Sequence, residues 1–361
     1  MNKIKNIEIY RFLFALVICY MHMMMNWANL YKTDDLFNHC KHITAGGFCV
    51  EFFFIIAGYF LYFSIQRSDN VLDLVIKKIK RLFPVLLFSL MFICILKIFF
   101  YKVVFKWSEL AYDLIFLQST ALPVTKGINV AAWYVSALVF VSAFYALIVK
   151  SLNKRQGLFA ILICSFLGLS ALAKANGAVT DLVNFYLTIG TLRGITYMGI
   201  GYLTAEFLQR KGDSIKEFLN SNWFTKTLTT IFEISATGLI FYFVTVGKNL
   251  TSARTLIAFT FVFLFICLIL RAGLLSRILD NNISAFLGKY AYSIYLMQAV
   301  FNIIARKTLW KDYTFMSEHF ALALLLNIAC YIILGVVTYH LVEKPPEKLK
   351  AIAVKLIQKK G

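Results

Sequence analysis

Long runs of hydrophobic residues, separated by short polar and basic segments, make up most of this chain. A run of about 20 apolar residues is long enough for a helix to cross a bilayer, whereas a transmembrane barrel shows short segments of alternating polarity. The pattern therefore predicts an all-α polytopic membrane bundle of about ten transmembrane helices. The predicted spans are residues 7–30, 47–66, 82–101, 130–149, 156–173, 186–208, 227–246, 253–271, 285–305 and 320–342.

The composition agrees with a protein that lies in lipid. Of the 361 residues, 60% are hydrophobic, whereas soluble domains are about 45–50% apolar. The first apolar stretch is too long for the core of a signal peptide and lacks a cleavage site of small residues, so we expect it to remain as the first helix. We expect one transmembrane domain over residues 1–361, with no appended soluble domain, because no soluble domain fits in the remaining length.

The distribution of Lys and Arg between the spans indicates an orientation. With the N-terminus in the cytoplasm, 22 of these residues fall on the cytoplasmic side and 11 on the opposite side. Cytoplasmic loops are enriched in Lys and Arg, so we predict a multi-pass protein of the plasma (inner) membrane with both termini cytoplasmic. The net charge of +19 is explained by basic loops that contact anionic membrane lipids, and we expect no nucleic-acid partner. The same loops could attract a polyanionic cosubstrate.

The first predicted span contains three ionisable residues, Glu8, Arg11 and His22. The step of 11 residues from Arg11 to His22 equals three helical turns plus about 20°, so both lie on one face, roughly 16 Å apart along the axis. Glu8 can pair with Arg11 across one turn. Ionisable residues inside a span are candidates for function. The alternative is an arginine whose head group reaches water at the membrane surface and a buried structural histidine.

Further charged residues lie in or beside other spans. Glu51 is expected in the outer half of the bundle, where it could fix the tautomer of the span histidine, His22, or simply form the polar end of its span. Arg193 and Glu233 are either functional or members of ion pairs whose partners the sequence does not identify. Two histidines lie three residues apart in an outer loop without further ligands nearby, so we expect no metal site.

Six short motifs follow one another from the first span to the last. They are Glu8-Ile-Tyr-Arg11 followed by His22, Val50-Glu-Phe-Phe-Phe-Ile-Ile-Ala-Gly-Tyr-Phe-Leu61, Lys77-Lys-Ile-Lys-Arg-Leu-Phe-Pro84, Trp133-Tyr-Val-Ser136, Tyr290-Ala-Tyr-Ser-Ile-Tyr-Leu296 and Val342-Glu-Lys-Pro345. In order and spacing they resemble the motifs of acyltransferase family 3, whose polytopic membrane proteins O-acylate surface polysaccharides and related glycans. The resemblance covers almost the whole chain.

Four positions depart from the family pattern. Glu51 stands where the family usually has Asp, and Ala57 where it often has Ser. Lys78 stands where a second Arg is common, and Gln298 replaces a frequent His. These differences could alter the acceptor.

The resemblance implies transfer of an acyl group, usually acetyl, from acyl-coenzyme A to a hydroxyl of a surface polysaccharide, lipopolysaccharide or lipid-linked sugar, with no bound cofactor. Cationic side chains would hold the coenzyme A phosphates, and His22 would act as general base or as a nucleophile that carries the acyl group. The candidate catalytic residues are His22 and Glu51, and the candidate substrate-binding residues are Glu8, Arg11, Lys78, Arg81, Trp133, Tyr134, Arg193 and Glu343.

Other interpretations remain open at this point. Trp133 and Tyr134 could stack on the sugar or the adenine, or could belong to an aromatic belt at the membrane interface. The main rival function is a transporter or flippase of sugars or lipids, in which the buried charges would relay protons or bind cargo. Transporter sites often use spans broken by Gly or Pro, whereas residues 12–25 contain neither. A non-catalytic membrane scaffold is a third interpretation, which the buried charges argue against.

Overall fold

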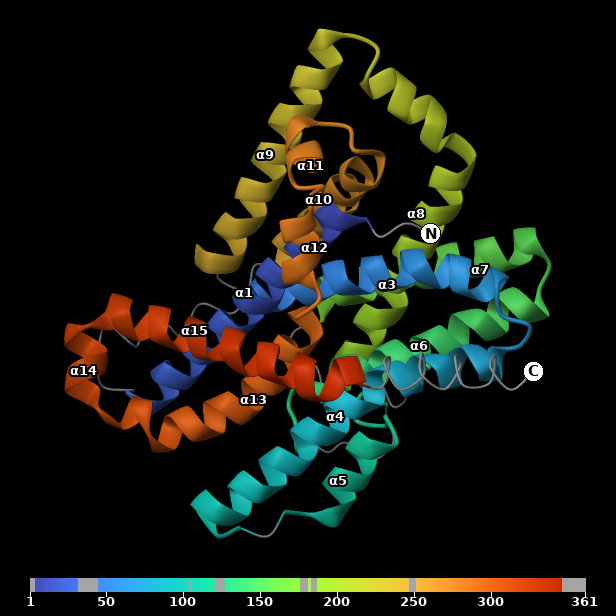
Figure 1. The fold of residues 1–361 in the computed structure, drawn as a ribbon. Coiled ribbons are helices and arrows are strands. Elements are labelled where there is room, and N and C mark those ends of the chain that lie inside the picture. Colours follow the sequence, from blue (N-terminus) through green and yellow to red (C-terminus); the bar gives the residue numbers. More distant parts are fainter. Residues whose placement is uncertain are drawn as a thin grey trace, which may run out of the picture.

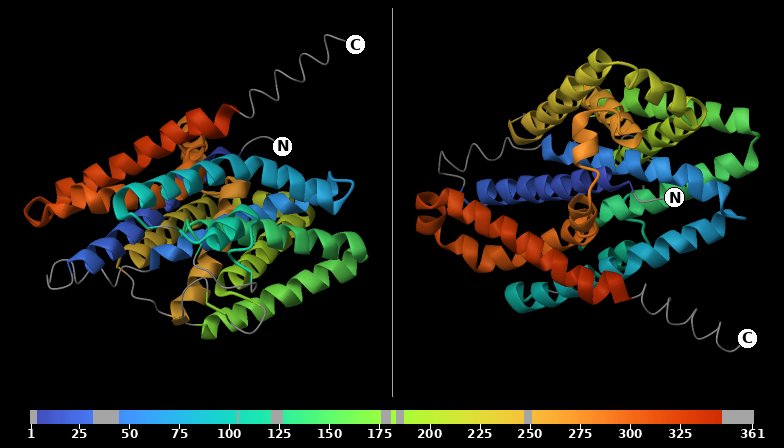
Figure 2. Two further views of the ribbon diagram at one scale, coloured as in Figure 1. Left: turned by 90° about the horizontal axis from the view of Figure 1, so that it is seen from below. Right: turned by 45° about the horizontal axis from the view of Figure 1, so that its top comes forward.

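The computed structural model describes residues 4–31, 45–103, 105–120, 127–175, 181–182, 187–246 and 251–345. Within these ranges the regular structure is helical, and the β pairing consists of two isolated bridges. The long helices run roughly side by side (Figures 1 and 2). The predicted all-α fold is confirmed.

Each of the ten predicted spans falls on a long helix. These helices are α1 (Lys5–Leu30), α3 (Cys49–Gln66), α4 (Val71–Tyr101), α6 (Ala132–Ser151), α7 (Lys154–Lys174), α8 (Ile189–Leu219), α9 (Trp223–Val246), α10 (Thr251–Leu270), α13 (Ala291–Lys307) and α15 (Phe320–Thr338). Shorter elements connect or extend them. They are η1 (Ala45–Phe48), α5 (Trp107–Leu114), α11 (Leu274–Ile278), α12 (Asn282–Gly288), η2 (Leu309–Lys311), α14 (Tyr313–Glu318) and the π-helical η3 (Tyr339–Glu343).

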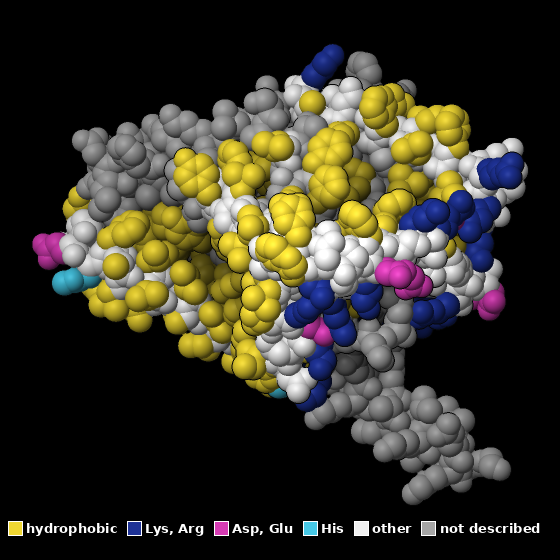
Figure 3. All heavy atoms as spheres, turned by 90° about the horizontal axis from the view of Figure 1, so that it is seen from above, with side chains coloured by type: hydrophobic (Ala, Val, Ile, Leu, Met, Phe, Trp, Pro, Cys, Tyr) yellow, Lys and Arg dark blue, Asp and Glu magenta, His cyan; other side chains and the backbone are white. Residues whose placement is uncertain are grey.

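Seven helical segments in the described part of the chain are long and apolar enough to cross a membrane. They comprise α1, η1 with α3, α4, α6, α7, most of α9, and α15 with η3. The predicted count of about ten is not confirmed. Helix α13 has only 17 residues, the apolar part of α10 is short, and α8 is long but not among the sufficiently apolar segments. On the face drawn in Figure 3, hydrophobic side chains cover a wide area and most Lys and Arg side chains lie toward one end. The protein is membrane-embedded.

Helix α4 begins about three turns earlier than the predicted span 82–101. Asn70 caps its N-terminus, since its side-chain oxygen accepts a hydrogen bond of 2.7 Å from the backbone N–H of Asp73. The basic residues that were expected to lie in a loop are therefore on the helix. Lys78 and Arg81, three residues apart, thus lie on one side of α4.

Helices α3 and α8 make the closest helix contact in the site region. A Cβ atom on Gly58 would collide with the backbone of Met198, and a Cβ atom on Gly201 would collide with the backbone of Ile55. Glycine at both positions lets the two backbones touch, as small residues do at helix contacts in membranes. This contact fixes the relative position of every side chain that α3 and α8 present to the site.

Helices α1 and α13 run parallel and in register. Just before α13 begins, Gly288 at the end of α12 packs against Glu8 near the start of α1. Near their ends, Arg306 Nε donates a hydrogen bond of 2.8 Å to Asn26 Oδ1. Both contacts join residues whose numbers differ by 280. Because all helices rise by the same 1.5 Å per residue, His22 lies level with residue 302 of α13.

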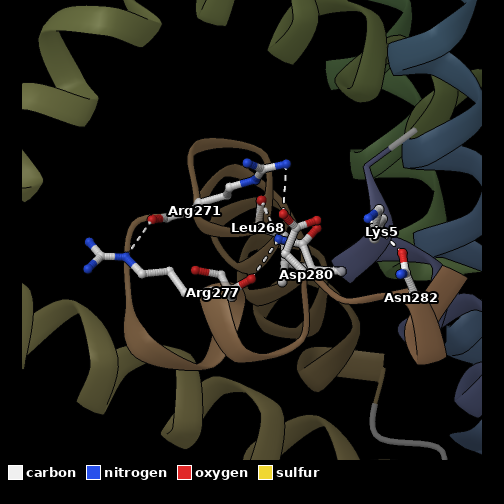
Figure 4. A network of polar contacts seen from close by, with 8 residues as sticks. Lys5, Leu268, Arg271, Arg277, Asp280 and Asn282 are labelled. Atoms are coloured by element: carbon white, nitrogen blue, oxygen red, sulfur yellow. Dashed lines mark hydrogen bonds and ion pairs between the residues drawn. The ribbon is translucent and has the colours of Figure 1, made fainter. Parts of the chain in front are cut away.

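A polar network holds the start of α1 (Figure 4). Lys5 Nζ donates to Asn282 Oδ1 at 2.8 Å, and the Asn6 amide donates to the carbonyl oxygens of Leu268 and Ser276 at 2.8 and 2.9 Å. These bonds connect α1 to the end of α10, to α11 and to α12. They fix the first turn of α1, which contains Glu8 and precedes Arg11 by one turn.

Helix α5 is held to the bundle by a buried carboxylate. The Asp113 carboxylate accepts hydrogen bonds from the backbone N–H groups of Ile128 and Asn129 at 2.7 and 3.1 Å. The Asn129 amide donates in turn to Ser89 Oγ and to the Leu296 carbonyl oxygen. Asp113 thereby ties α5 to α4 and α13.

We expect Asp113→Asn to change how stability depends on pH. Burial raises the pKa of Asp113 to about 7, opposed in part by its backbone hydrogen bonds. Because this folded-state pKa lies above the unfolded value, the wild type loses stability as pH rises from about 4 to 7, by up to about 1.4 kcal/mol per pH unit. In thermal unfolding measured in detergent between pH 5 and pH 8, the unfolding temperature of the variant should rise relative to that of the wild type as pH rises. Parallel curves would contradict the prediction.

Candidate active site

A cavity of about 450 Å³ opens among α1, α3, α4, α6 and α13. Six of the ten residues proposed from sequence line it, namely Glu8, Arg11, Lys78, Arg81, Tyr134 and Glu343. The rest of the wall is mostly apolar and aromatic, and includes Tyr292 and Tyr295 of α13. The cavity therefore combines cations and carboxylates with an apolar, tyrosine-rich lining.

The three cationic residues of the cavity differ in whether a nearby carboxylate compensates their charge. Arg11 bonds to the carboxylate of Glu8 at 3.1 Å, as the spacing predicted. Lys78 Nζ donates a hydrogen bond of 2.6 Å to Ser142 Oγ, a neutral partner. No salt bridge among the described residues involves Arg81. Lys78 and Arg81 thus supply most of the positive charge that an anionic ligand would meet.

Helix α13 is held against the cavity by its own polar side chains. The Tyr292 hydroxyl donates to the Leu82 carbonyl oxygen at 2.8 Å, and the Tyr295 hydroxyl donates to the Ala131 carbonyl oxygen at 3.1 Å. Ser293 Oγ donates to Glu343 Oε2 at 2.6 Å. Glu343 ends a π-helical turn, a local irregularity that is frequent at functional sites.

A second polar cluster lies between α3, α6 and α8. Arg193 Nε is 3.4 Å from Glu51 Oε1, and the side chains of both residues are buried, with 7% and 0% exposure. The Arg193 guanidinium also donates to the Gly47 carbonyl oxygen at 2.5 Å and lies 5.3 Å from the centre of the Trp133 ring. The partner of Arg193 that the sequence left unidentified is therefore Glu51.

The structure places Glu51 against Arg193, and the suggested pairing of Glu51 with His22 stays a prediction. Glu51 faces Arg193 because α3 and α8 approach each other closely at their glycines. Among the described residues, no hydrogen bond joins the Glu51 carboxylate to the His22 ring. The contact with Arg193 spans more than 140 residues of sequence, which helix periodicity cannot foresee.

Aromatic rings connect the second cluster to the cavity. The Phe54 ring lies 6.1 Å from the Trp133 ring and 4.8 Å from the Tyr134 ring, measured between centroids. The Tyr134 ring lies 5.6 Å from that of Tyr295. Two successive residues of α6 thus lie in different environments, because Trp133 contacts Arg193 whereas Tyr134 lines the cavity.

His22 lies in the second half of α1 and is partly exposed. It is not among the residues that line the cavity. Its carbonyl oxygen accepts a hydrogen bond from Asn26, while its ring makes no hydrogen bond with any residue that the structure describes. The structure thus places Arg11 in the cavity and His22 three turns along the same face of α1.

Two residues of the cavity, Tyr292 and Tyr295, were not proposed from sequence. Their signal was present, since both lie in the motif Tyr290–Leu296 that carries part of the resemblance. Glu233, in contrast, lies away from the cavity. Its carboxylate accepts hydrogen bonds from the backbone N–H groups of Gly273 and Ser276, both at 3.0 Å, at the start of α11.

No group of three or more His, Cys, Asp or Glu residues in the described ranges could hold a metal ion. The two loop histidines, His39 and His42, lie outside the described residues. The cavity itself offers cations that bind anions, tyrosines that bind rings or hydroxyls, and carboxylates that orient the cations.

A family model for an acyltransferase domain, that of acyltransferase family 3, matches residues 4–339. The chain belongs to acyltransferase family 3. No curated protein and no solved structure matches this family member.

The family motifs converge on one place in this acyltransferase. Each of the six motifs quoted above contributes at least one residue to the wall of the cavity, although they are spread from α1 to η3. Arg11, Lys78, Tyr134, Tyr295 and Glu343 represent five of them, and the apolar part of α3 represents the sixth. The protein is thus a membrane acyltransferase whose family signature surrounds one cavity.

Proposed function

We propose that this protein transfers an acyl group, most simply acetyl, from acyl-coenzyme A to a hydroxyl of a surface polysaccharide, lipopolysaccharide or lipid-linked sugar. The observation that carries the proposal is the convergence of all six family motifs on the cavity between α1, α3, α4, α6 and α13. A cavity with partly uncompensated cations and a tyrosine-rich wall suits a ligand that is anionic at one end and aromatic at another.

Coenzyme A fits this description by its chemistry. Its phosphates would meet Lys78 and Arg81, whose charges are not balanced by ion pairs with described residues. Arg11, held by Glu8, would present its remaining N–H groups at the inner end of the cavity. The long, flexible arm that carries the thioester could then extend along the shared face of α1 and α13 toward His22.

At His22, two routes lead to the same products. In the first, the imidazole takes the proton of the acceptor hydroxyl, the hydroxyl oxygen attacks the thioester carbonyl carbon, the carbon–sulfur bond breaks, and the proton passes to the leaving thiolate. In the second, a ring nitrogen attacks the thioester carbonyl carbon, the carbon–sulfur bond breaks and coenzyme A leaves as its thiolate. The acceptor oxygen then attacks the acyl carbon on the ring, the carbon–nitrogen bond breaks, and the hydroxyl proton passes to the thiolate. Glu51 would act on either route only indirectly, through Arg193 and Trp133.

The proposed location is the plasma (inner) membrane, with both termini cytoplasmic. The excess of basic residues on the N-terminal side supports this orientation. The cavity would then face the compartment that supplies acyl-coenzyme A, since Arg11, Lys78 and Arg81 lie toward the cytoplasmic ends of α1 and α4. The second half of α1, with His22, would lie nearer the opposite surface.

Arg81→Glu tests the donor site. We expect this change to weaken acetyl-coenzyme A binding at least tenfold, because a hydrogen bond to a charged group contributes about 1.5–3 kcal/mol and the new carboxylate adds repulsion. Lys80→Glu is the matched control, because Lys80 is exposed on the same helix and does not line the cavity. Binding is measured by calorimetry on detergent-solubilised protein. Equal affinities for the two variants would overturn the assignment of the cavity to the donor.

A further inference from the structure

Gln298 of α13 is a buried amide that finds no hydrogen-bonding partner in the described part of the chain. Its exposure is 1%, and neither its oxygen nor its nitrogen makes a hydrogen bond with any described residue. An amide buried without hydrogen bonds costs about 1–3 kcal/mol by mutational measures, and more where no water can reach it. A hydrophobic residue of the same size would avoid this cost, so retention of the amide calls for an explanation.

The position of Gln298 links the cavity to His22. On α13 it lies three residues after Tyr295, which lines the cavity, and four residues before Asn302, so the three residues share one face. Gln298 lies eight residues before Arg306, which bonds to Asn26 of α1. At 1.5 Å per residue in both helices, Gln298 therefore lies near the level of residue 18 of α1, between the levels of Arg11 and His22. The unpaired amide thus lies along the path that joins the donor cavity to the proposed catalytic histidine.

The neighbouring polar residues on this path are already paired. Asn302 Oδ1 accepts a hydrogen bond from the Tyr331 hydroxyl, and Asn26 Oδ1 accepts one from Arg306. Those amides hold α13 to α15 and to α1. Gln298 does not contribute to helix packing in this way, which leaves both of its polar atoms for a ligand.

The two unpaired atoms define the chemistry of that ligand. The amide oxygen needs a donor and the amide nitrogen needs an acceptor. A thioester carbonyl could satisfy only the nitrogen, whereas a hydroxyl, or two adjacent hydroxyls of a sugar, both donates and accepts. The amides in the flexible arm of coenzyme A also donate and accept, so the affinity of a Gln298 variant for acetyl-coenzyme A distinguishes the donor from a polyhydroxylated acceptor.

We propose that Gln298 binds the hydroxyl-bearing part of the acceptor and positions it beside His22. This inference rests on the proposed function and adds a residue that selects a polyhydroxylated acceptor. Both amide atoms are inaccessible in this structure, so acceptor binding would separate α1 from α13 locally. Binding of the acceptor would then supply the missing hydrogen bonds and remove the free-energy cost of burying the Gln298 amide without them.

The test compares Gln298→Met with the wild type in three measurements. Methionine has a similar volume and no hydrogen-bonding amide, so we expect an unfolding temperature equal to or above that of the wild type and an unchanged affinity for acetyl-coenzyme A. We expect transfer to fall at least tenfold. The donor is acetyl-coenzyme A with a 14C-labelled acetyl group, and the acceptor is supplied by membranes of source cells that lack the gene. Transfer is measured as the radioactivity in these membranes that hydroxylamine releases.

Gln118→Met provides the matched control for a structural amide. Gln118 is also buried, and its amide donates to the Asn129 carbonyl oxygen at 3.1 Å, so this variant should lose stability. If Gln298→Met loses as much stability as Gln118→Met, the Gln298 amide is paired within the protein and the inference is wrong. If Gln298→Met transfers acetyl groups at the wild-type rate, the inference is also wrong, while the proposed function stands. A wild type that transfers no acetyl group would overturn both.

Discussion

His22→Ala is expected to lower acyl transfer by about 10²–10⁴-fold, the range that a general base contributes, while leaving insertion and coenzyme A affinity unchanged. The reason is that the His22 ring holds no described part of the fold together, since it makes no hydrogen bond with any described residue. It shares a face of α1 with Arg11, which lines the donor cavity. The measurement is specific activity per folded molecule, with monodispersity and unfolding temperature taken from the same preparation.

His340→Ala is the control for the loss of an imidazole elsewhere in the bundle. His340 lies in the π-helical end of the last helix, where its ring is 3.3 Å from the Tyr290 hydroxyl, and it does not line the cavity. This variant should transfer acyl groups at close to the wild-type rate. If His22→Ala retains more than about a tenth of wild-type activity, the loss is smaller than the smallest effect that a general base usually contributes. His22 would then not carry the chemistry.

Removing one member of the Glu51–Arg193 pair is expected to destabilise the protein strongly. Both side chains are buried, and an uncompensated buried charge typically costs about 3–5 kcal/mol. Arg193→Met should therefore lower the unfolding temperature and the yield of monodisperse protein. The double variant Glu51→Gln with Arg193→Met removes both charges and should recover much of the loss, which fluorescence-detected gel filtration after heating would show.

Lys154→Met supplies the comparison with an exposed ion pair. Lys154 contacts Glu206 at 3.1 Å, but its side chain is 67% exposed, and exposed pairs contribute only about 0–1 kcal/mol.

A double variant of Glu51 and Arg193 that is no more stable than Arg193→Met would show that the two charges do not depend on each other. The recovered double variant also separates roles: if it folds and transfers acyl groups, Glu51 acts in the fold and not in the chemistry.

The helical framework was largely predictable because lipid leaves few alternatives. A backbone in hydrocarbon must satisfy its own hydrogen bonds, so runs of apolar residues identify helices, and each of the ten predicted ranges falls mostly on helix in the described part of the chain. The start of α4 was missed because Lys77, Lys78 and Arg81 were interpreted as a loop. The Asn70 cap begins the helix before these residues.

The site was predictable where its residues share a helix or a motif. Arg11 and Glu8 pair as their spacing indicated, and Lys78, Arg81, Tyr134 and Glu343 all reach the cavity. The partner of Glu51 was not predictable, because the Arg193 contact depends on how two distant helices pack. The unpaired state of Gln298 was hidden for the same reason, since only the packed structure determines which amides find partners.

The glycine contact between α3 and α8 determines which parts of the protein can move. Two helices whose backbones touch have no intervening side chains that could change rotamer, so sliding or separation would break many contacts at once. We therefore expect α3 and α8, together with Arg193, to behave as a rigid body during turnover. The changes in distance that admit the donor and the acceptor would fall to α1, α4 and α13, whose mutual contacts include long side chains that can rearrange. Substrate access would thus open the bundle on the side away from the glycines.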